Sequence, residues 1–240
     1  MEIIFLSVLV FIASAIGTMT GFGISTVMIP VVLLFYPLPQ TLFFVGIIHW
    51  VGNIWKLVLF RRGIHWKLIL SFGIPGIAAS FLGALLVFRI PTALLSRILA
   101  GFIIIYVLYL FAKPSFKVKE STLTAVSGGV FSGFLAGIFG MGGAVRGLFL
   151  STFDLPKAIY IATAGAIALF IDTTRLMTYF LKGIRLQSLI LWGMLIFIPA
   201  SFLGAKIAQT VVDRIPQKYF RIVIAVFLFL VAVKLLLFPA

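Results

Sequence analysis

The sequence predicts an all-α polytopic membrane protein built from two homologous repeats of about four helical elements each. Three observations support this fold class: an apolar composition, short motifs that recur at an offset near 120 residues, and a glycine-rich interruption at the matching place in each half. Hydrophobic residues make up 63% of the 240 residues and charged residues 10%, whereas soluble domains carry about 25% charged residues. This composition excludes a soluble domain.

The internal repeat rests on motifs that keep their order and their offset. A duplicated membrane unit is typical of secondary transporters, whose substrate site lies between the two copies. The matched segments are Ser-Phe-Leu-Gly-Ala at 80–84 and 201–205, Arg-Ile-Pro at 89–91 and 214–216, Leu-Pro at 38–39 and 155–156, and Gly-Ile at 63–64 and 183–184.

Each repeat contains apolar stretches long enough to cross a bilayer, which takes about 18 residues. We expect one integral membrane domain with a first repeat at 1–112, a polar linker at 113–120 and a second repeat at 121–240. The apolar stretches run over 3–36, 38–60, 66–88 and 93–112 in the first repeat, and over 121–153, 157–181, 186–211 and 217–238 in the second.

The first stretch of each repeat is too long for one straight crossing. A helix of 33 residues would be about 50 Å long, against a hydrocarbon core of about 30 Å. Glycines near its middle weaken a helix and favour a break there. The broken element either crosses once or is re-entrant, so that it dips in and returns to the same side.

The distribution of positive loop residues favours the re-entrant arrangement. If the first element crosses once, the two sides carry eight and seven loop Lys and Arg residues, which is almost no bias. If it returns, the split is eleven to four, as the positive-inside rule prefers. Each repeat then has three net crossings, and the two repeats are inverted relative to each other.

The rest of the composition excludes several functions. There is no cysteine, and two histidines and five acids leave little for a metal site or for acid–base catalysis. We therefore expect no metal, no cofactor and no enzyme activity. The net charge of +14 fits loops that set topology and contact anionic lipid, so we expect the lipid bilayer as a partner and no nucleic acid.

The two glycine-rich breaks are the strongest candidates for a binding site. Non-helical backbone at membrane depth is tolerated only when it is buried or lines a wet cavity. A half-helix that starts after the break points free N–H groups at that cavity, which favours an anion. The alternative for any single glycine is close helix packing. The candidate residues at the breaks are Thr18, Thr20, Gly21, Gly23, Ser25, Gly140, Gly142 and Gly143.

Charged residues inside the apolar stretches are the next candidates, because ionisable groups at membrane depth usually face the protein interior. Arg146 follows the second break directly, with snorkelling to the interface as its alternative role. Asp172 and Arg175 lie three residues apart on one helix face, so that Asp172 either orients a substrate-binding Arg175 or forms a purely structural ion pair with it.

A polar face in the second stretch adds His49, Asn53 and Lys56, which are spaced four and three residues apart. His49 is a candidate for proton coupling, with a plain buried hydrogen bond as the alternative. Asn53 matches Thr173 under the repeat offset, and both are predicted to line one cavity; an interhelical hydrogen bond is the alternative for Asn53. For Lys56 we expect snorkelling to the interface.

Several of these segments together resemble the sulfite exporter TauE/SafE family, also called the 4-toluene sulfonate uptake permease family. The similarity extends over essentially the whole chain, and it depends on the order, spacing and duplication of small glycine-rich motifs. The segments that carry it are 127–143, Leu155-Pro156, Ala162-Thr163 and 201–205.

The resemblance implies a secondary carrier for a sulfur-containing anion such as sulfite, a sulfonate or sulfoacetate, with or without proton coupling. It also implies a multi-pass protein of the plasma membrane, most simply a prokaryotic cytoplasmic membrane. Two departures concern the breaks: the family often has three consecutive glycines, where this chain has Gly142-Gly143-Ala144 and Gly21-Phe22-Gly23, and it often has a proline where Leu150 stands.

We therefore expect a transporter that moves a small sulfur-containing anion by alternating access, with its site at the interface of the repeats. A channel or a membrane scaffold without coupled transport is the alternative. The sequence does not define which anion is carried, the direction of transport or the oligomeric state.

Overall fold

The computed structural model describes residues 2–20, 23–60, 63–112 and 120–211, together with residues 229, 232, 233, 236 and 237. All regular elements within these ranges are helices, and six of them (α1, α3, α4, α6, α8 and α9) are long and apolar enough to cross a membrane. The predicted linker, apart from Glu120, and most of the predicted element at 217–238 lie outside the described residues. The helices are α1 Glu2–Thr20, α2 Ser25–Val32, α3 Leu38–Leu59, α4 Trp66–Leu86, α5 Thr92–Ala112, α6 Thr122–Phe139, α7 Gly143–Leu150, the 3-10 turn η1 Ser151–Phe153, α8 Lys157–Leu181 and α9 Ser188–Val211.

Local sequence sets several of the helix ends. The side chain of Ser121 accepts a hydrogen bond from the N–H of Thr124 and caps α6. At the other end of α6, Gly140 adopts φ +68° and its N–H donates to the carbonyl oxygen of Ala136. Glycine tolerates this left-handed conformation without the steric penalty of a side chain, so the second break starts where the sequence allows it.

The first element of each predicted repeat folds as an antiparallel helical hairpin. A methyl group at Gly17 of α1 would lie 2.6 Å from the backbone of Ile24, and the rings of Phe5 and Phe35 are 5.5 Å apart. The chain thus enters along α1, breaks, and returns along α2 to the end where it started. The hairpin of α6 and α7 closes similarly, with the hydroxyl of Ser132 donating to the carbonyl oxygen of Gly142 at 2.9 Å.

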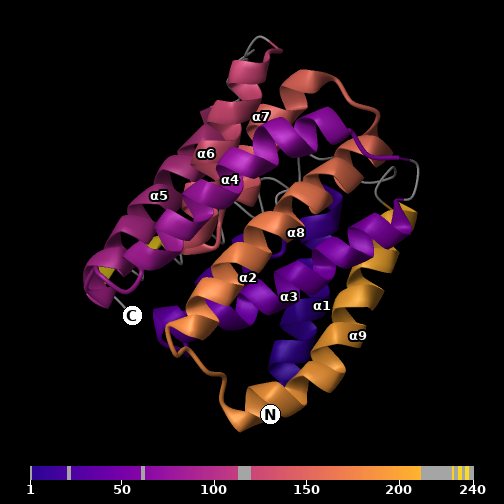
Figure 1. Cartoon of the computed structure of the whole chain (residues 1–240). Coiled ribbons are helices and arrows are strands. Elements are labelled where there is room, and N and C mark those ends of the chain that lie inside the picture. Colours follow the sequence, from indigo (N-terminus) through magenta and orange to yellow (C-terminus); the bar gives the residue numbers. More distant parts are fainter. Residues whose placement is uncertain are drawn as a thin grey trace.

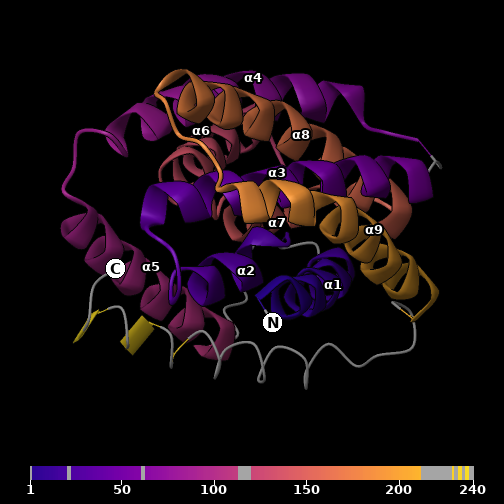
Figure 2. The ribbon, with the colours of Figure 1, turned by 90° about the horizontal axis from the view of Figure 1, so that it is seen from below.

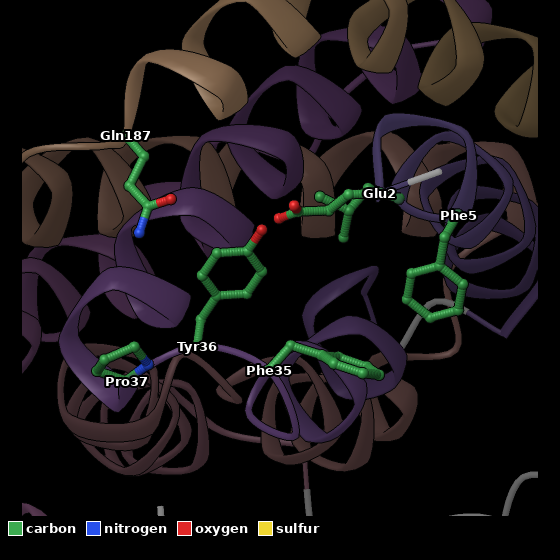
Figure 3. Close-up of a pocket in the computed structure, with 7 residues that line it drawn as sticks. Glu2, Phe5, Phe35, Tyr36, Pro37 and Gln187 are labelled. Carbon is green, nitrogen blue, oxygen red and sulfur yellow. The ribbon is translucent and has the colours of Figure 1, made fainter.

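The two hairpins start at opposite ends of the molecule. The start of α1 and the start of α3 share a cavity of about 620 Å³, in which the side chains of Glu2 and Tyr36 point toward one another (Figure 3). Helix α3 runs antiparallel to α8, because Leu42 contacts Arg175 whereas Lys56 lies by Gly165. Helices α8, α4 and α6 run parallel to one another. The start of α6 is therefore at the end remote from Glu2.

Apart from α5, the described α-helices form two bundles that meet mainly along one helix pair, with a smaller contact between α2 and α7. The first bundle contains α1, α2, α3 and α9, and the second contains α4, α6, α7 and α8. Helices α3 and α8 lie side by side at the centre, with α9 and α1 on one side of them and α4 and α6 on the other (Figures 1 and 2). We call the α3–α8 contact the seam. Each bundle combines helices from both predicted repeats.

Glycines bring the outer helices into backbone contact at matching places. A methyl group at Gly83 of α4 would lie 2.5 Å from the carbonyl oxygen of Phe134 in α6. A methyl group at Gly204 of α9 would lie 2.3 Å from the carbonyl oxygen of Phe11 in α1. Gly83 and Gly204 are the glycines of the repeated Ser-Phe-Leu-Gly-Ala motif, so the same motif makes the same kind of contact in both bundles.

Large apolar side chains cover much of the outer surface. Trp66, Trp192 and Leu195 are each more than 60% exposed, as expected of side chains that face lipid rather than water. The described chain is therefore a multi-pass membrane protein.

The glycine contacts predict a sharp difference between two substitutions in the same helix. Gly83→Ala places a methyl group against fixed backbone, and overpacking of this kind costs about 1–3 kcal/mol. Gly73→Ala is the matched control, because a methyl group there has nothing within 4 Å and alanine favours a helix by about 1 kcal/mol. Thermal unfolding of the purified protein should show a lower melting temperature for Gly83→Ala and an unchanged or higher one for Gly73→Ala. Equal melting temperatures would contradict the close contact.

Candidate functional site

A cluster of charged side chains is buried where the seam meets the helix breaks. Within the described ranges, three buried side chains are formally cationic, namely Lys56, Arg146 and Arg175, and one is anionic, Asp172. Each of the four is at most 3% exposed. They come from α3, α7 and α8. Because an unpaired buried charge is costly, an excess of positive charge here indicates a place where a negative ligand is favoured.

The carboxylate of Asp172 lies at the centre of this cluster. Its Oδ1 accepts a hydrogen bond of 2.7 Å from Nε of Arg175, on the same helix. Its Oδ2 accepts one of 3.1 Å from Nδ2 of Asn53 in α3, and Nδ1 of His49 lies 3.0 Å from the same oxygen. One acid therefore connects both sides of the seam, and the predicted Asp172–Arg175 pairing is present.

Lys56 takes part in the same network. Its Nζ donates to Oδ1 of Asn53 at 3.2 Å, and the side chain is only 3% exposed. The expectation that Lys56 snorkels to the interface is therefore wrong. The amide of Asn53 can accept from the ammonium group and donate to Asp172 at the same time, and this pairing keeps the cation inside the protein.

Arg175 spans the space between α3 and the second break. Its Nη1 donates to the carbonyl oxygen of Leu42 at 3.4 Å, while Nη2 has no hydrogen-bond partner among the described residues. One turn further along α8, the hydroxyl of Tyr179 donates to the carbonyl oxygen of Gly137. Tyr179 and Leu42 were missed from the sequence. The spacing of 172, 175 and 179 on one helix face would have identified Tyr179.

Both helix breaks reach this cluster through a glycine with positive φ. A methyl group at Gly23, where φ is +91°, would lie 2.6 Å from Nε2 of His49. A methyl group at Gly140 would lie 3.1 Å from Nη1 of Arg175. His49 and Arg175 are the two side chains that flank Asp172 from opposite sides of the seam. The structure thus brings the two predicted breaks and the predicted charged residues together.

Arg146, in the first turn of α7, is 2% exposed and lies within electrostatic range of Asp172 and Arg175. Its Nε has no hydrogen-bond partner in the described part of the chain. The snorkelling alternative for Arg146 is therefore wrong. A guanidinium group offers five donors in a planar fork, which suits an oxyanion.

The remaining candidates divide into four groups. Thr18 and Ser25 are buried beside the first break, and their hydroxyl groups lack partners among the described residues. Gly142 and Gly143 begin the return helix α7, and the carbonyl group of Gly142 is used by Ser132. Thr173 lies outside the cluster: it is exposed, and its Oγ1 accepts from Nε1 of Trp50 at 2.8 Å. Gly21 and the side chain of Thr20 lie outside the described residues.

The arrangement can bind an anion through nitrogen and hydroxyl donors. In the described segments, no three His, Cys, Asp or Glu side chains gather as metal ligands. The cavity near Glu2 and Tyr36 is lined by none of the cluster residues, and the carboxylate of Glu2 in its lining makes it unsuited to an anion (Figure 3).

The positive-φ glycines predict a second matched pair of substitutions. Gly140→Ala strains the backbone and also forces a methyl group against Ile29 and Arg175, whereas Gly183→Ala, at φ +89°, causes comparable strain with nothing within 4 Å. We expect Gly140→Ala to lower the melting temperature clearly more than Gly183→Ala does. Similar losses in the two variants would contradict the close packing of Gly140 against Ile29 and Arg175.

Two comparisons with known proteins bear on the family of the chain. No curated protein matches the chain. The family model described as Sulfite exporter TauE/SafE matches residues 6–235 of the 240. This match covers both hairpins, both seam helices and all the buried charges, and the chain therefore belongs to the sulfite exporter TauE/SafE family.

Proposed function

We propose that this protein is a secondary transporter that moves a small sulfur-containing anion, such as sulfite, a sulfonate or sulfoacetate, across the plasma membrane by alternating access. The observation that carries the proposal is the buried excess of cationic side chains at the place where two helix breaks meet. Lys56, Arg146 and Arg175 are buried within electrostatic range of one carboxylate, that of Asp172.

Electrostatics favours an oxyanion as the ligand. Three formal positive charges and one negative charge leave a net charge of +2 in the cluster, with His49 neutral. In a medium of low polarity this surplus is unfavourable until an anion neutralises it. The unpartnered nitrogens Nε of Arg146 and Nη2 of Arg175 provide donors that a sulfite or sulfonate group accepts well.

The two-bundle architecture supports alternating access. The hairpins start at opposite ends of the molecule, and the repeated motif makes matching glycine contacts in both bundles, as inverted repeats would. The proposed substrate site lies on the seam between the bundles. A rocking movement of one bundle against the other would open the site first to one side and then to the other.

His49 is our candidate for a proton-coupling group. It is buried, it adjoins Asp172, and a methyl group at Gly23 would contact its Nε2. An imidazole that changes its charge beside the site would link anion and proton movement. Counterflow of labelled substrate in proteoliposomes distinguishes a carrier from a channel, because a channel does not exchange substrate against a gradient.

The anion site is tested by thermal shift of the purified protein against sulfite, thiosulfate, sulfate, sulfonates and carboxylates. A ligand at 100 times its Kd stabilises the native state by about 2.7 kcal/mol, so a bound anion should raise the melting temperature. We expect the shift to be lost in Arg175→Gln and Arg146→Gln and reduced in Arg175→Lys. Arg185→Gln, which removes an exposed arginine, is the control and should retain it. If both Gln variants keep the full shift, these two arginines do not bind the anion.

The membrane orientation is tested by labelling single cysteines, since the natural chain has none. The positive-inside rule favours the cytoplasm for the end that carries the linker, and the outside for the loop after α8. In intact cells, a membrane-impermeant maleimide should label Arg185→Cys and not Lys117→Cys. The opposite labelling pattern would reverse the proposed orientation.

A further inference from the structure

The polar contacts across the seam gather around one side chain. From α3, the amide of Asn53 and the imidazole of His49 reach Oδ2 of Asp172 in α8. From α8, Arg175 reaches the carbonyl oxygen of Leu42. One further bond, from Trp50 to Thr173, lies beside this cluster. The carboxylate of Asp172 is the only acid among these groups in the described chain, so it is the main electrostatic link between the two bundles.

The two oxygens of the Asp172 carboxylate contact different helices. Oδ1 bonds to Arg175, three residues along the same helix, and this bond does not cross the seam. Oδ2 bonds to groups of α3 and does cross it. Loss of the Oδ2 contacts alone would release the first bundle from the second, while Asp172 would still be paired with a cation and would avoid the large cost of an unpaired buried charge.

The groups that hold Oδ2 are also suited to an oxyanion. Asn53 donates through its amide nitrogen, and the ammonium group of Lys56 donates to the oxygen of the same amide. The two ring nitrogens of His49 make no aligned hydrogen bond. Arg146 has a free donor nearby. A carboxylate and a sulfonate group present similar oxygens to such donors, so the two compete for the same partners.

We propose that Asp172 is a built-in counterion that holds the seam closed by occupying the donors of α3, and that an incoming oxyanion displaces its Oδ2 and thereby frees the two bundles to move. This inference rests on the proposed anion transport and specifies how substrate binding reaches the bundles. The displaced carboxylate retains its hydrogen bond to Arg175, and the anion accepts hydrogen bonds from Asn53, His49 and Arg146.

The proposal makes Asp172 a competitor of the substrate, which separates it from a purely orienting role. If Asp172 only positions Arg175, its replacement weakens anion binding. If it competes with the anion, its isosteric replacement by asparagine removes a like charge from the site and strengthens binding. Two like charges a few ångströms apart repel each other even at the effective dielectric constant near a protein surface, so we expect a change of about tenfold in Kd.

The test measures two quantities in the same protein: how closely the seam helices α3 and α8 stay together, and how tightly an anion binds. Trp50→Cys with Thr173→Cys places two thiols across the seam, where a hydrogen bond joins the natural pair. Trp55→Cys with Ser201→Cys is the matched control, because it replaces a similar tryptophan–hydroxyl bond of 3.2 Å between α3 and α9 within the first bundle. Crosslinking by a short bismaleimide is measured with and without methanesulfonate, which, unlike sulfite, does not add to the maleimide groups of the crosslinker.

We expect saturating methanesulfonate to lower crosslinking of the 50–173 pair and to leave the 55–201 pair unchanged. Asp172→Asn should lower crosslinking of the 50–173 pair even without the anion. It should also bind methanesulfonate about tenfold more tightly in a thermal-shift titration. Asp154→Asn removes an exposed carboxylate outside the seam and should behave as the natural protein does. If Asp172→Asn does not fold, Asn53→Leu removes one Oδ2 contact, keeps the Asp172–Arg175 pair, and should likewise lower crosslinking without the anion.

The outcomes separate the two proposals. If no anion of the panel stabilises either the natural protein or Asp154→Asn, the proposed transport function is wrong. If anions bind the natural protein, while Asp172→Asn binds them more weakly and crosslinks at 50–173 as the natural protein does, anion transport stands and the counterion proposal is overturned. Tighter binding together with a loosened seam supports it.

Discussion

The buried carboxylate of Asp172 is the interaction on which the rest of the site depends. It neutralises part of the positive charge that Lys56, Arg146 and Arg175 bring into the interior, and it connects a helix of each bundle. Without an acid here, three cations would share a space of low polarity, and each would carry the full cost of desolvation. A single acid leaves the balance positive, and this surplus is the basis of the proposed anion site.

Glycine determines where this charged cluster lies. At the breaks, Gly23 and Gly140 adopt backbone conformations that other residues resist and leave room for His49 and Arg175. In the outer helices, Gly83 and Gly204 let backbones approach so closely that the hairpins pack tightly within their bundles. The same residue type therefore serves two purposes, one at the site and one in its support, and composition alone does not separate them.

Much of the fold was predictable from the sequence, because apolar stretches of sufficient length leave little choice but membrane helices. The predicted stretches at 38–60, 66–88 and 157–181 agree with α3, α4 and α8 to within two residues. The charge bias favoured hairpins that return to their own side, and the geometry of α1 and α2 agrees. The role of Lys56 was not predictable, since the length of the lysine stem allows it to reach outward or inward and only the position of Asn53 decides between them. Thr173 shows the limit of the repeat offset. Its position on α8 matches that of Asn53 on α3, but its side chain lies outside the cluster that contains Asn53.

Each bundle combines helices from both halves of the chain, and this arrangement has a consequence for biosynthesis. The hairpin of α1 and α2 packs against α9, and Phe11 lies 193 positions (204 minus 11) before its contact at Gly204. Helix α1 is thus synthesised long before the helix against which it packs. Contacts between residues so far apart in the sequence form slowly. Completion of the first bundle must therefore await α9, whereas α4 and α6 can pair as soon as the second hairpin is inserted.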